Sequence, residues 1–297
     1  MKLALGTVQF GMDYGVTNRA GQVGMAEVEK ILRLAADAGI DTLDTAVGYG
    51  DAEARVGRVL AGGGVGSFGA PPFKVVTKLP GGIKAADVAG VVEGSLRRVG
   101  VEGLDGLLAH SAGDLLSASG QGVIAAMEGL KREGLCERVG ASLYYPCEFA
   151  GLAEEAALDL FQVPLSLLDQ RFNGPEVVSV AGEKGLSLHG RSLLLQGVLV
   201  EPLGRLPGFF QGFSNYLRPL GETAARFGVD LLTLALTAAW LSPAVERVVL
   251  GCCSEAQLRQ LIECFDAAAE VAGEVDLAAF ACDDEKLLLP VNWVKDV

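Results

Sequence analysis

Short apolar runs that are typical of β-strands alternate along the whole chain with amphipathic runs that are typical of helices. No proline-rich or charged linker interrupts the alternation. The strand candidates are LALGT (3–7), TLDT (42–45), KVVTK (74–78), GLLAH (106–110), RVGAS (138–142), LFQV (160–163), LSLHGR (186–191) and RVVLG (247–251). Because eight βα units in 297 residues fit a closed barrel better than an open sheet, the sequence predicts an α/β fold, a single-domain (β/α)8 TIM barrel over residues 1–297.

The runs between these strands have the pattern of helices that cover such a barrel. AEVEKILRLAADAG, DVAGVVEGSLRRVG and GVIAAMEGLKREG end at a glycine, as a helix often does. Two segments break the rhythm: residues 61–72 are rich in glycine, and residues 198–218 form a longer connection with Pro202, Pro207, Phe209, Phe210 and Phe213. The second follows the seventh strand, and we expect it to cover the substrate, with packing of its phenylalanines as the alternative.

The spacing of Gly64, Gly66 and Gly69 matches the GxGxxG pattern of dinucleotide-binding turns. That pattern binds a pyrophosphate when it follows a strand and opens a helix. Here it follows the helical run DAEARVGRVL and leads through two prolines into a strand. We therefore interpret it as a connection and expect any nucleotide to bind elsewhere.

The acidic composition excludes several classes of partner. A net charge of −13 and a pI near 4.7 argue against nucleic acid, or an anionic membrane, as the partner of a broad basic surface. No run reaches the roughly 18 to 20 apolar residues of a membrane span, and the start MKLALGTVQFG lacks the apolar core and cleavage site of a signal peptide. We expect a cytoplasmic protein, and the sequence leaves its oligomeric state open.

The cysteine pattern favours neither disulfides nor a metal. The six cysteines contain no CxxC pair, and in a chain of this length they indicate reduced core thiols. Adjacent Cys252 and Cys253, with two distant histidines, make a poor ligand set for zinc, so no metal is expected.

Four polar residues stand at or just after the ends of three predicted strands: Asp44 and Tyr49 in LDTAVGYG, Lys78 in KVVTK and His110 in LDGLLAH. In a parallel barrel these strand ends form the catalytic face. A tyrosine with an ordinary pKa of about 10 is a weak acid at neutral pH, but a nearby lysine cation stabilises the phenolate, and an aspartate keeps that lysine charged. Each residue alone has a structural explanation, such as a helix cap for Asp44. Their shared placement predicts a site that donates a proton, with histidine as a partner of the substrate oxygen.

Longer motifs surround these residues and recur in order along nearly the whole chain: LALGTVQFG, GIDTLDTAVGYGDAEARVGRVL, KVVTK, LDGLLAHS, VGASLYYP, LFQVPLSLLDQR, GRSLLLQGVL, VVLGCCSEAQL and LLLPVNW. In this order they resemble the aldo/keto reductase family. The resemblance implies an NAD(P)-dependent oxidoreductase that reduces an aldehyde or ketone to an alcohol by hydride transfer. The opening LGTVQFGMDYGV resembles that of bacterial members associated with sugar and cell-surface polysaccharide metabolism, so the expected small-molecule substrate is a sugar-derived or other polar carbonyl compound.

The resemblance also implies roles for individual residues. Tyr49 matches the general acid, Lys78 and Asp44 the residues that tune it, and His110 the residue that orients the carbonyl. Ser142 and Gln162 match contacts to the nicotinamide carboxamide, and the segment that begins at Gly251 matches the adenosine-phosphate end. The residues implied to bind the cofactor are Gly6, Thr7, Asp44, Ser142, Gln162, Arg191, Ser192, Gln196, Gly197, Gly251, Cys253, Ser254 and Gln257.

Three positions depart from the family pattern. Leu143 follows Ser142 where many members have asparagine, and Arg191 replaces an aromatic ring that stacks on the nicotinamide, although a guanidinium plane can stack too. Gln257 stands where some NADPH-specific members have arginine, with Arg259 as the nearest other cation. The family pattern favours NADP(H) as the cofactor, and NAD(H) stays an alternative.

Two other functions stay open. A barrel aldolase would use Lys78 as a Schiff-base nucleophile, but a neighbouring aspartate would keep that lysine protonated and a poor nucleophile. A nucleotide-sensing or regulatory barrel would keep the fold and the cofactor with little turnover. The presence of all four polar residues argues against that second function.

Overall fold

Eight parallel strands form a closed barrel in the computed structural model, which describes residues 2–62 and 73–293. Each strand pairs with its neighbour in sequence, and the first pairs with the last to close the sheet. The strands are β1 (Leu3–Gly6), β2 (Thr42–Asp44), β3 (Lys74–Leu79), β4 (Leu104–Ala109), β5 (Cys136–Ser142), β6 (Leu160–Pro164), β7 (Ser187–Arg191) and β8 (Val245–Gly251). All eight predicted strands are confirmed, with ends that shift by two residues at most, and so is the TIM-barrel fold.

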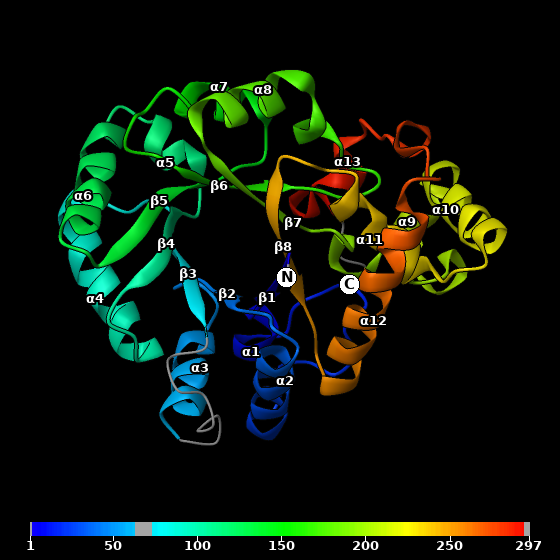
Figure 1. The fold of residues 1–297 in the computed structure, drawn as a ribbon, viewed down its shortest axis with the longest axis horizontal. Coiled ribbons are helices and arrows are strands. Elements are labelled where there is room, and N and C mark those ends of the chain that lie inside the picture. The colour runs from blue at the N-terminus through cyan, green and yellow to red at the C-terminus, as the bar shows by residue number, and fades with distance from the viewer. Residues whose placement is uncertain (1, 63–72, 294–297) are drawn as a thin grey trace.

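Helices surround the barrel, and Figure 1 shows α3, α4, α6, α7, α8 and α12 around the outside of the strands. Helices α4, α8 and α10 end before glycines with left-handed φ angles of 77°, 64° and 67°, a conformation that favours glycine. Within the described part of the chain the α-helices are α1 (Val8–Gly11), α2 (Met25–Asp37), α3 (Ala52–Ala61), α4 (Val88–Val99), α5 (Ala112–Leu116), α6 (Gly120–Arg132), α7 (Pro146–Leu152), α8 (Pro175–Lys184), α9 (Gly208–Gln211), α10 (Ser214–Phe227), α11 (Leu231–Trp240), α12 (Glu255–Ala272) and α13 (Glu285–Leu288).

The strands are buried on both faces, which explains their nearly continuous apolar sequences. Inside the barrel, Val76, Leu108 and Leu160 pack together and are fully buried. Lys78 and Gln162 stand two residues after Val76 and Leu160 on the same strands and therefore share their inward face. This apolar layer supports the polar groups from below, at the C-terminal mouth of the barrel.

The connection at 198–218 is packed down rather than open. It contains a 3₁₀-helix at Leu203–Arg205, helix α9 and the start of α10. Phe210 and Phe213 are 2% and 9% exposed, and the Phe210 ring centroid lies 5.0 Å from that of Trp293. The packing alternative is confirmed for the phenylalanines, because they join an apolar cluster with α10 and α11, and a role of the segment in covering the substrate stays a prediction. Its first part lines the main cavity through Val200, Glu201 and Arg205.

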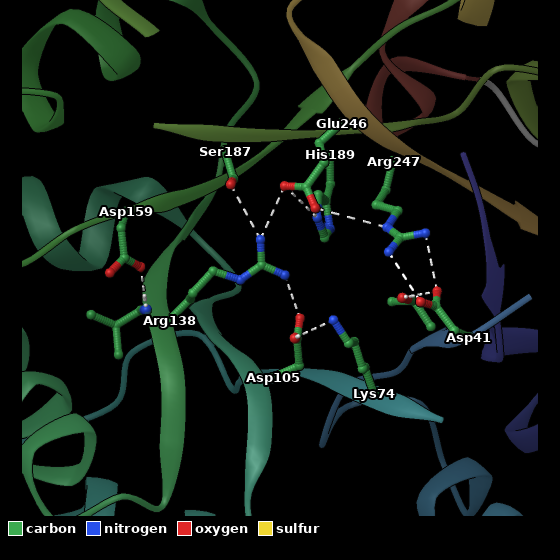
Figure 2. A network of polar contacts seen from close by, with 11 residues as sticks. Asp41, Lys74, Asp105, Arg138, Asp159, Ser187, His189, Glu246 and Arg247 are labelled. Atoms are coloured by element: carbon green, nitrogen blue, oxygen red, sulfur yellow. Dashed lines mark hydrogen bonds and ion pairs between the residues drawn. The ribbon is translucent and has the colours of Figure 1, made fainter. Parts of the chain in front are cut away.

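The N-terminal ends of the strands carry a network of charged side chains, which Figure 2 shows from close by. Arg138 on β5 contacts Asp105 on β4 and lies 3.1 Å from Glu246 on β8. Arg247 on β8 lies 3.0 Å from Asp41, which precedes β2. These pairs link strands at the end of the barrel away from Lys78. Groups at this end of a TIM barrel contribute to stability rather than to catalysis.

His189 on β7 is buried beside this network. Its side chain is almost fully buried, and neither ring nitrogen has a hydrogen-bond partner, since Nε2 lies 4.0 Å from Glu246 Oε2. Burial and the Arg138 guanidinium lower the pKa of His189 to about 4. The imidazole is therefore neutral in the folded protein at neutral pH.

We expect the free energy of unfolding to fall as the pH decreases from about 6.5 to 4, the ordinary and the folded pKa of His189. As the pH decreases, His189 takes up its proton in the unfolded chain before it does so in the folded protein. The stability that neutral His189 confers is therefore complete above the ordinary pKa of 6.5 and is lost as the pH falls toward the folded-state pKa of about 4. Urea unfolding of the wild type and of His189→Gln, near neutral pH and near pH 4.5, measures this loss. The wild type should lose about 2 kcal/mol more than the variant; an equal loss in both proteins would contradict the assignment.

The cysteines differ in part from the prediction of core thiols. All six are free, and Cys136, Cys252, Cys264 and Cys282 are buried. Cys147 is exposed and Cys253 is half-buried, so the prediction is wrong for these two. Residues 2–62 and 73–293 contain no group of histidine, cysteine and carboxylate side chains suited to a metal ion.

In the described part of the chain, no helix combines the length and apolar character needed to cross a bilayer. The GxGxxG spacing of Gly64, Gly66 and Gly69 lies outside the described residues.

Candidate active site

Lys78 and Asp44 form a buried ion pair at the C-terminal mouth of the barrel. Lys78 Nζ donates to Asp44 Oδ1 at 2.6 Å and to the Thr45 carbonyl at 2.9 Å, and the two charged side chains are 1% and 5% exposed. The other carboxylate oxygen of Asp44 accepts a hydrogen bond from Gln162 Nε2 at 2.7 Å. The ends of β2, β3 and β6 bring these side chains together from distant parts of the sequence.

Tyr49 follows β2 in a turn that a close backbone contact holds in place. A Cβ atom on Gly11 would lie 1.7 Å from the Tyr49 carbonyl oxygen, and one on Gly50 would lie 2.2 Å from the Gly11 carbonyl oxygen. Gly50 also has a φ angle of 55°, which favours glycine. The contact between α1 and this turn therefore requires both glycines, and it holds the Tyr49 ring centroid 5.1 Å from Lys78 Nζ.

His110 follows β4 and faces Tyr49. The two rings meet edge to face, with centroids 5.8 Å apart. The backbone N–H of His110 donates to the Leu79 carbonyl at 3.3 Å, so the end of β3 fixes its position. The structure thus brings all four predicted catalytic residues to one place.

Lys78 and His110 differ in charge. Burial by itself would lower the pKa of Lys78, but the Asp44 carboxylate and Tyr49 outweigh burial and raise that pKa above its ordinary value. Burial and the Lys78 cation lower the pKa of His110 to about 4. At neutral pH the site has a lysine cation beside Tyr49 and a neutral imidazole, which can donate one hydrogen bond and accept another.

A cavity of about 850 Å³ opens beside these residues, a size within the range of ligand sites. Lys78, which is buried, and Ser254 do not line it. The predicted site residues that do line it are Gly6, Thr7, Asp44, Tyr49, His110, Ser142, Gln162, Arg191, Ser192, Gln196, Gly197, Gly251, Cys253 and Gln257. The cavity therefore joins the predicted catalytic residues to nearly all of the predicted cofactor residues.

One wall of the cavity is a strained segment that follows β7. Ser192, Leu195 and Gln196 have φ angles of 65°, 45° and 54°, a conformation that costs energy in residues other than glycine. Strain of this kind gathers at ligand sites. On helix α1, Gln9 also lines the cavity, and its buried Oε1 has no hydrogen-bond partner. A bound polar ligand could satisfy that oxygen.

Arg191 packs beside the catalytic residues. Its guanidinium lies 4.3 Å from the Tyr144 ring centroid, and one of its terminal nitrogens donates to the Leu143 carbonyl at 2.9 Å. Its Nε lies 3.4 Å from Ser142 Oγ. Arg191 therefore ties the end of β7 to the end of β5. The Leu143 side chain is buried in the core and does not line the cavity.

Two further tyrosines of the cavity, Tyr14 and Tyr144, are missed by reasoning from the sequence. Burial and the neighbouring Tyr49 raise the pKa of Tyr14 to about 12, so its phenol is neutral and acts through hydrogen bonds. The sequence holds a signal for Tyr144 in LYYP, because it stands two residues after the end of β5. Tyr14 follows the short helix α1 instead of a strand, so no local sequence pattern indicates that it lines the cavity.

At one end the cavity reaches the residues that precede and begin α12, where side chains cap that helix. Ser254 Oγ accepts from the Gln257 N–H at 3.1 Å, and Gln257 Oε1 accepts from the Cys253 N–H at 2.7 Å. Ser254 is thus an N-cap residue. Its contact with a cofactor phosphate stays a prediction.

The fold and the site together define a class of protein: a TIM-barrel enzyme with a buried lysine–aspartate pair beside a tyrosine and a histidine at its C-terminal mouth. The sequence profile of the aldo/keto reductase family matches residues 2–276. The chain belongs to the aldo/keto reductase family, and it is an oxidoreductase that acts on carbonyl and CH–OH groups.

Solved structures of similar fold carry the same family name or a related activity. Aldo-keto reductase AKR11C1 from Bacillus halodurans, in its holo form, is 20% identical with a TM-score of 0.73, and the match covers 96% of this chain and 94% of that one. The glycerol dehydrogenase AKR11B4 from Gluconobacter oxydans is 21% identical with a TM-score of 0.67, covering 100% and 94%. A putative aldo-keto reductase from Pseudomonas aeruginosa is 24% identical with a TM-score of 0.67, covering 90% of each chain. No curated protein sequence matches this chain.

Proposed function

We propose that the protein reduces an aldehyde or ketone to an alcohol with a nicotinamide dinucleotide as the hydride donor. The observation that carries the proposal is the buried Lys78–Asp44 pair beside Tyr49, with neutral His110 opposite. Such a group delivers a proton to an oxygen on which negative charge develops. Family membership supports a small-molecule carbonyl substrate.

The residues of the cavity fit the dinucleotide. They supply hydroxyl and amide groups from Thr7, Ser142 and Gln196, the unpartnered oxygen of Gln9, and backbone from a strained segment. A long polar ligand needs a wall of this kind. Bound there, the nicotinamide would supply a hydride for the carbonyl carbon.

Each catalytic side chain has a separate task in this proposal. The Lys78 cation stabilises the negative charge that develops on Tyr49 as its proton leaves. Asp44, held by Gln162, keeps Lys78 charged and in place. His110 donates a hydrogen bond to the carbonyl oxygen and thereby orients it for the proton of Tyr49.

The opening motif and the cavity bear on the identity of the substrate and on the choice between NAD(H) and NADP(H). The opening motif supports a sugar-derived or other polar carbonyl compound, and Tyr14 and Tyr144 offer hydroxyl groups that suit one. The family pattern favours NADP(H), and NAD(H) stays an alternative.

Oxidation of NADH and NADPH in the presence of a panel of aldehydes and ketones tests the proposed function. We expect turnover of at least one polar carbonyl compound, because all four catalytic groups are assembled. Tight nucleotide binding without turnover would indicate the regulatory alternative. Borohydride trapping of a substrate on Lys78 would indicate the aldolase, which the raised pKa of Lys78 disfavours.

A further inference from the structure

Arg191, the last residue of β7, brings an arginine side chain to the mouth of the barrel without a carboxylate partner. The residue is half-buried and lines the main cavity. Of its five N–H groups, one donates to the Leu143 carbonyl at 2.9 Å, and two others face Ser192 Oγ and Ser142 Oγ at 3.3 and 3.4 Å. Within residues 2–62 and 73–293 it forms no ion pair, and its other two N–H groups have no acceptor.

The guanidinium of Arg191 is held in place before any ligand binds. Its central carbon lies 4.3 Å from the Tyr144 ring centroid, and its contacts with Leu143 and Ser142 join it to the end of β5. A planar guanidinium in a fixed position forms charge-assisted hydrogen bonds with a carboxylate, and these are stronger where the charge is partly buried than in open water. The two unused N–H groups of Arg191 therefore suit a ligand with a negative charge.

The charge of Arg191 acts at the catalytic residues. Burial and the Lys78 cation are the main causes of the low pKa of His110, and the Arg191 cation lowers that pKa further. Burial and Tyr49 raise the pKa of Tyr14, and the Arg191 cation acts against that rise. Arg191 therefore lies near enough to these rings to meet a substrate whose carbonyl group is bound by Tyr49 and His110.

The charges around the cavity leave Arg191 unbalanced. Among the described residues two carboxylates line the cavity: Asp44 is paired with Lys78, and Glu201 lies 3.8 Å from Arg205. Because the Lys78–Asp44 pair has no net charge, Arg191 makes the catalytic end of the cavity positive. The chain as a whole has a net charge of −13 and repels anions, so a local cation is needed to attract an anionic substrate.

We propose that the substrate carries a carboxylate as well as its carbonyl group, and that Arg191 binds this carboxylate. The inference rests on the proposed function and adds a class of substrate to it. A carboxylate suits the site better than a phosphate, because one cation balances the single charge of a carboxylate, whereas a phosphate group carries about two charges. The hydroxyl groups of Tyr14 and Tyr144, which line the same cavity, suit hydroxyl groups on that acid.

Steady-state kinetics with matched pairs of carbonyl compounds tests the inference. In each pair a carboxylate replaces a hydroxymethyl group: glyoxylate with glycolaldehyde, succinate semialdehyde with γ-hydroxybutanal, and glucuronate with glucose. In at least one pair the wild type should give a kcat/KM for the acid about 10-fold or more above that for its partner, because a charge-assisted hydrogen bond confers about that factor. The ionic strength is kept constant and low, since salt screens the attraction.

Two substitutions of Arg191 separate its charge from its packing. Arg191→Gln removes the charge, and Arg191→Lys keeps the charge but loses the planar group that contacts Tyr144 and Leu143. The ratio of kcat/KM between the acid and its partner should fall about 10-fold or more in Arg191→Gln, chiefly through KM for the acid, and should stay within about threefold of the wild type in Arg191→Lys. Arg19→Gln is the matched control and should keep the wild-type ratio, because Arg19 lines the same cavity but is exposed to water.

Several results would overturn the inference and leave the proposed function standing. These are equal kcat/KM values within all three pairs for the wild type, an unchanged ratio in Arg191→Gln, or an equally large fall of the ratio in Arg191→Lys or Arg19→Gln. Titration of the same variants with NADH adds a further check, because weaker nucleotide binding with an unchanged ratio would assign Arg191 to the cofactor. Turnover of none of the compounds would count against the proposed function and against this inference with it.

Discussion

Replacement of Tyr49 by phenylalanine should lower kcat by roughly 100-fold or more and leave nucleotide affinity nearly unchanged. The variant loses the proton donor while its ring can still pack against His110, whose centroid lies 5.8 Å away. Because the hydroxyl gives up its proton only as charge develops on the substrate oxygen, the loss should fall on kcat more than on KM. Steady-state kinetics and nucleotide titration of the same preparation measure both effects.

Tyr14→Phe is the matched control for this substitution. Tyr14 lines the same cavity, but its pKa of about 12 makes it a poorer acid, and it lacks a lysine partner among the described contacts. That variant should alter KM more than kcat, since Tyr14 contributes a hydrogen bond and no proton. Near-normal turnover by Tyr49→Phe, or an equally large fall in kcat in Tyr14→Phe, would rule out Tyr49 as the acid.

The barrel, and the placement of the four proposed catalytic residues at its mouth, could be predicted from the sequence because both depend on local patterns. Strands buried on both faces are apolar throughout, so KVVTK and its counterparts stand out from amphipathic helices. A polar side chain at the end of such an apolar run is expected at the mouth of the barrel, because the rest of the strand is buried on both faces. The position of Lys78 at the end of KVVT follows from this rule, and the structure finds it in the ion pair with Asp44.

The remaining details depend on contacts between segments that no local pattern links. The predicted contact of Gln162 with the nicotinamide stays a prediction; the sequence did not predict that its amide nitrogen also donates to Asp44, which comes from another strand. From the sequence, the phenylalanines of 198–218 could either cover the substrate or pack against the protein. The contact of Phe210 with Trp293, which lies far along the chain, shows that Phe210 packs against the protein.

Replacement of Lys78 by methionine should lower kcat by roughly 1,000-fold or more. This loss of rate is larger than the one expected for Tyr49→Phe, and the variant should also lose stability. Without the ammonium, the negative charge that develops on Tyr49 during proton transfer has no neighbouring cation, and the substrate oxygen loses a nearby positive charge. Asp44 is also left buried without its counter-ion, and removal of one partner of a buried pair costs roughly 3 to 5 kcal/mol. Steady-state kinetics and urea unfolding of the purified variant measure the two losses.

The double variant Lys78→Met with Asp44→Asn separates these effects. Asparagine removes the unpaired charge and still offers an oxygen to Gln162 Nε2, which lies 2.7 Å from the carboxylate in the wild type. Stability should therefore recover by a large part of the roughly 3 to 5 kcal/mol, while kcat stays as low as in the single variant. Recovery of activity together with stability would mean that Lys78 acts only by holding the fold. Recovery of stability alone would show that its charge is needed for the proton transfer from Tyr49.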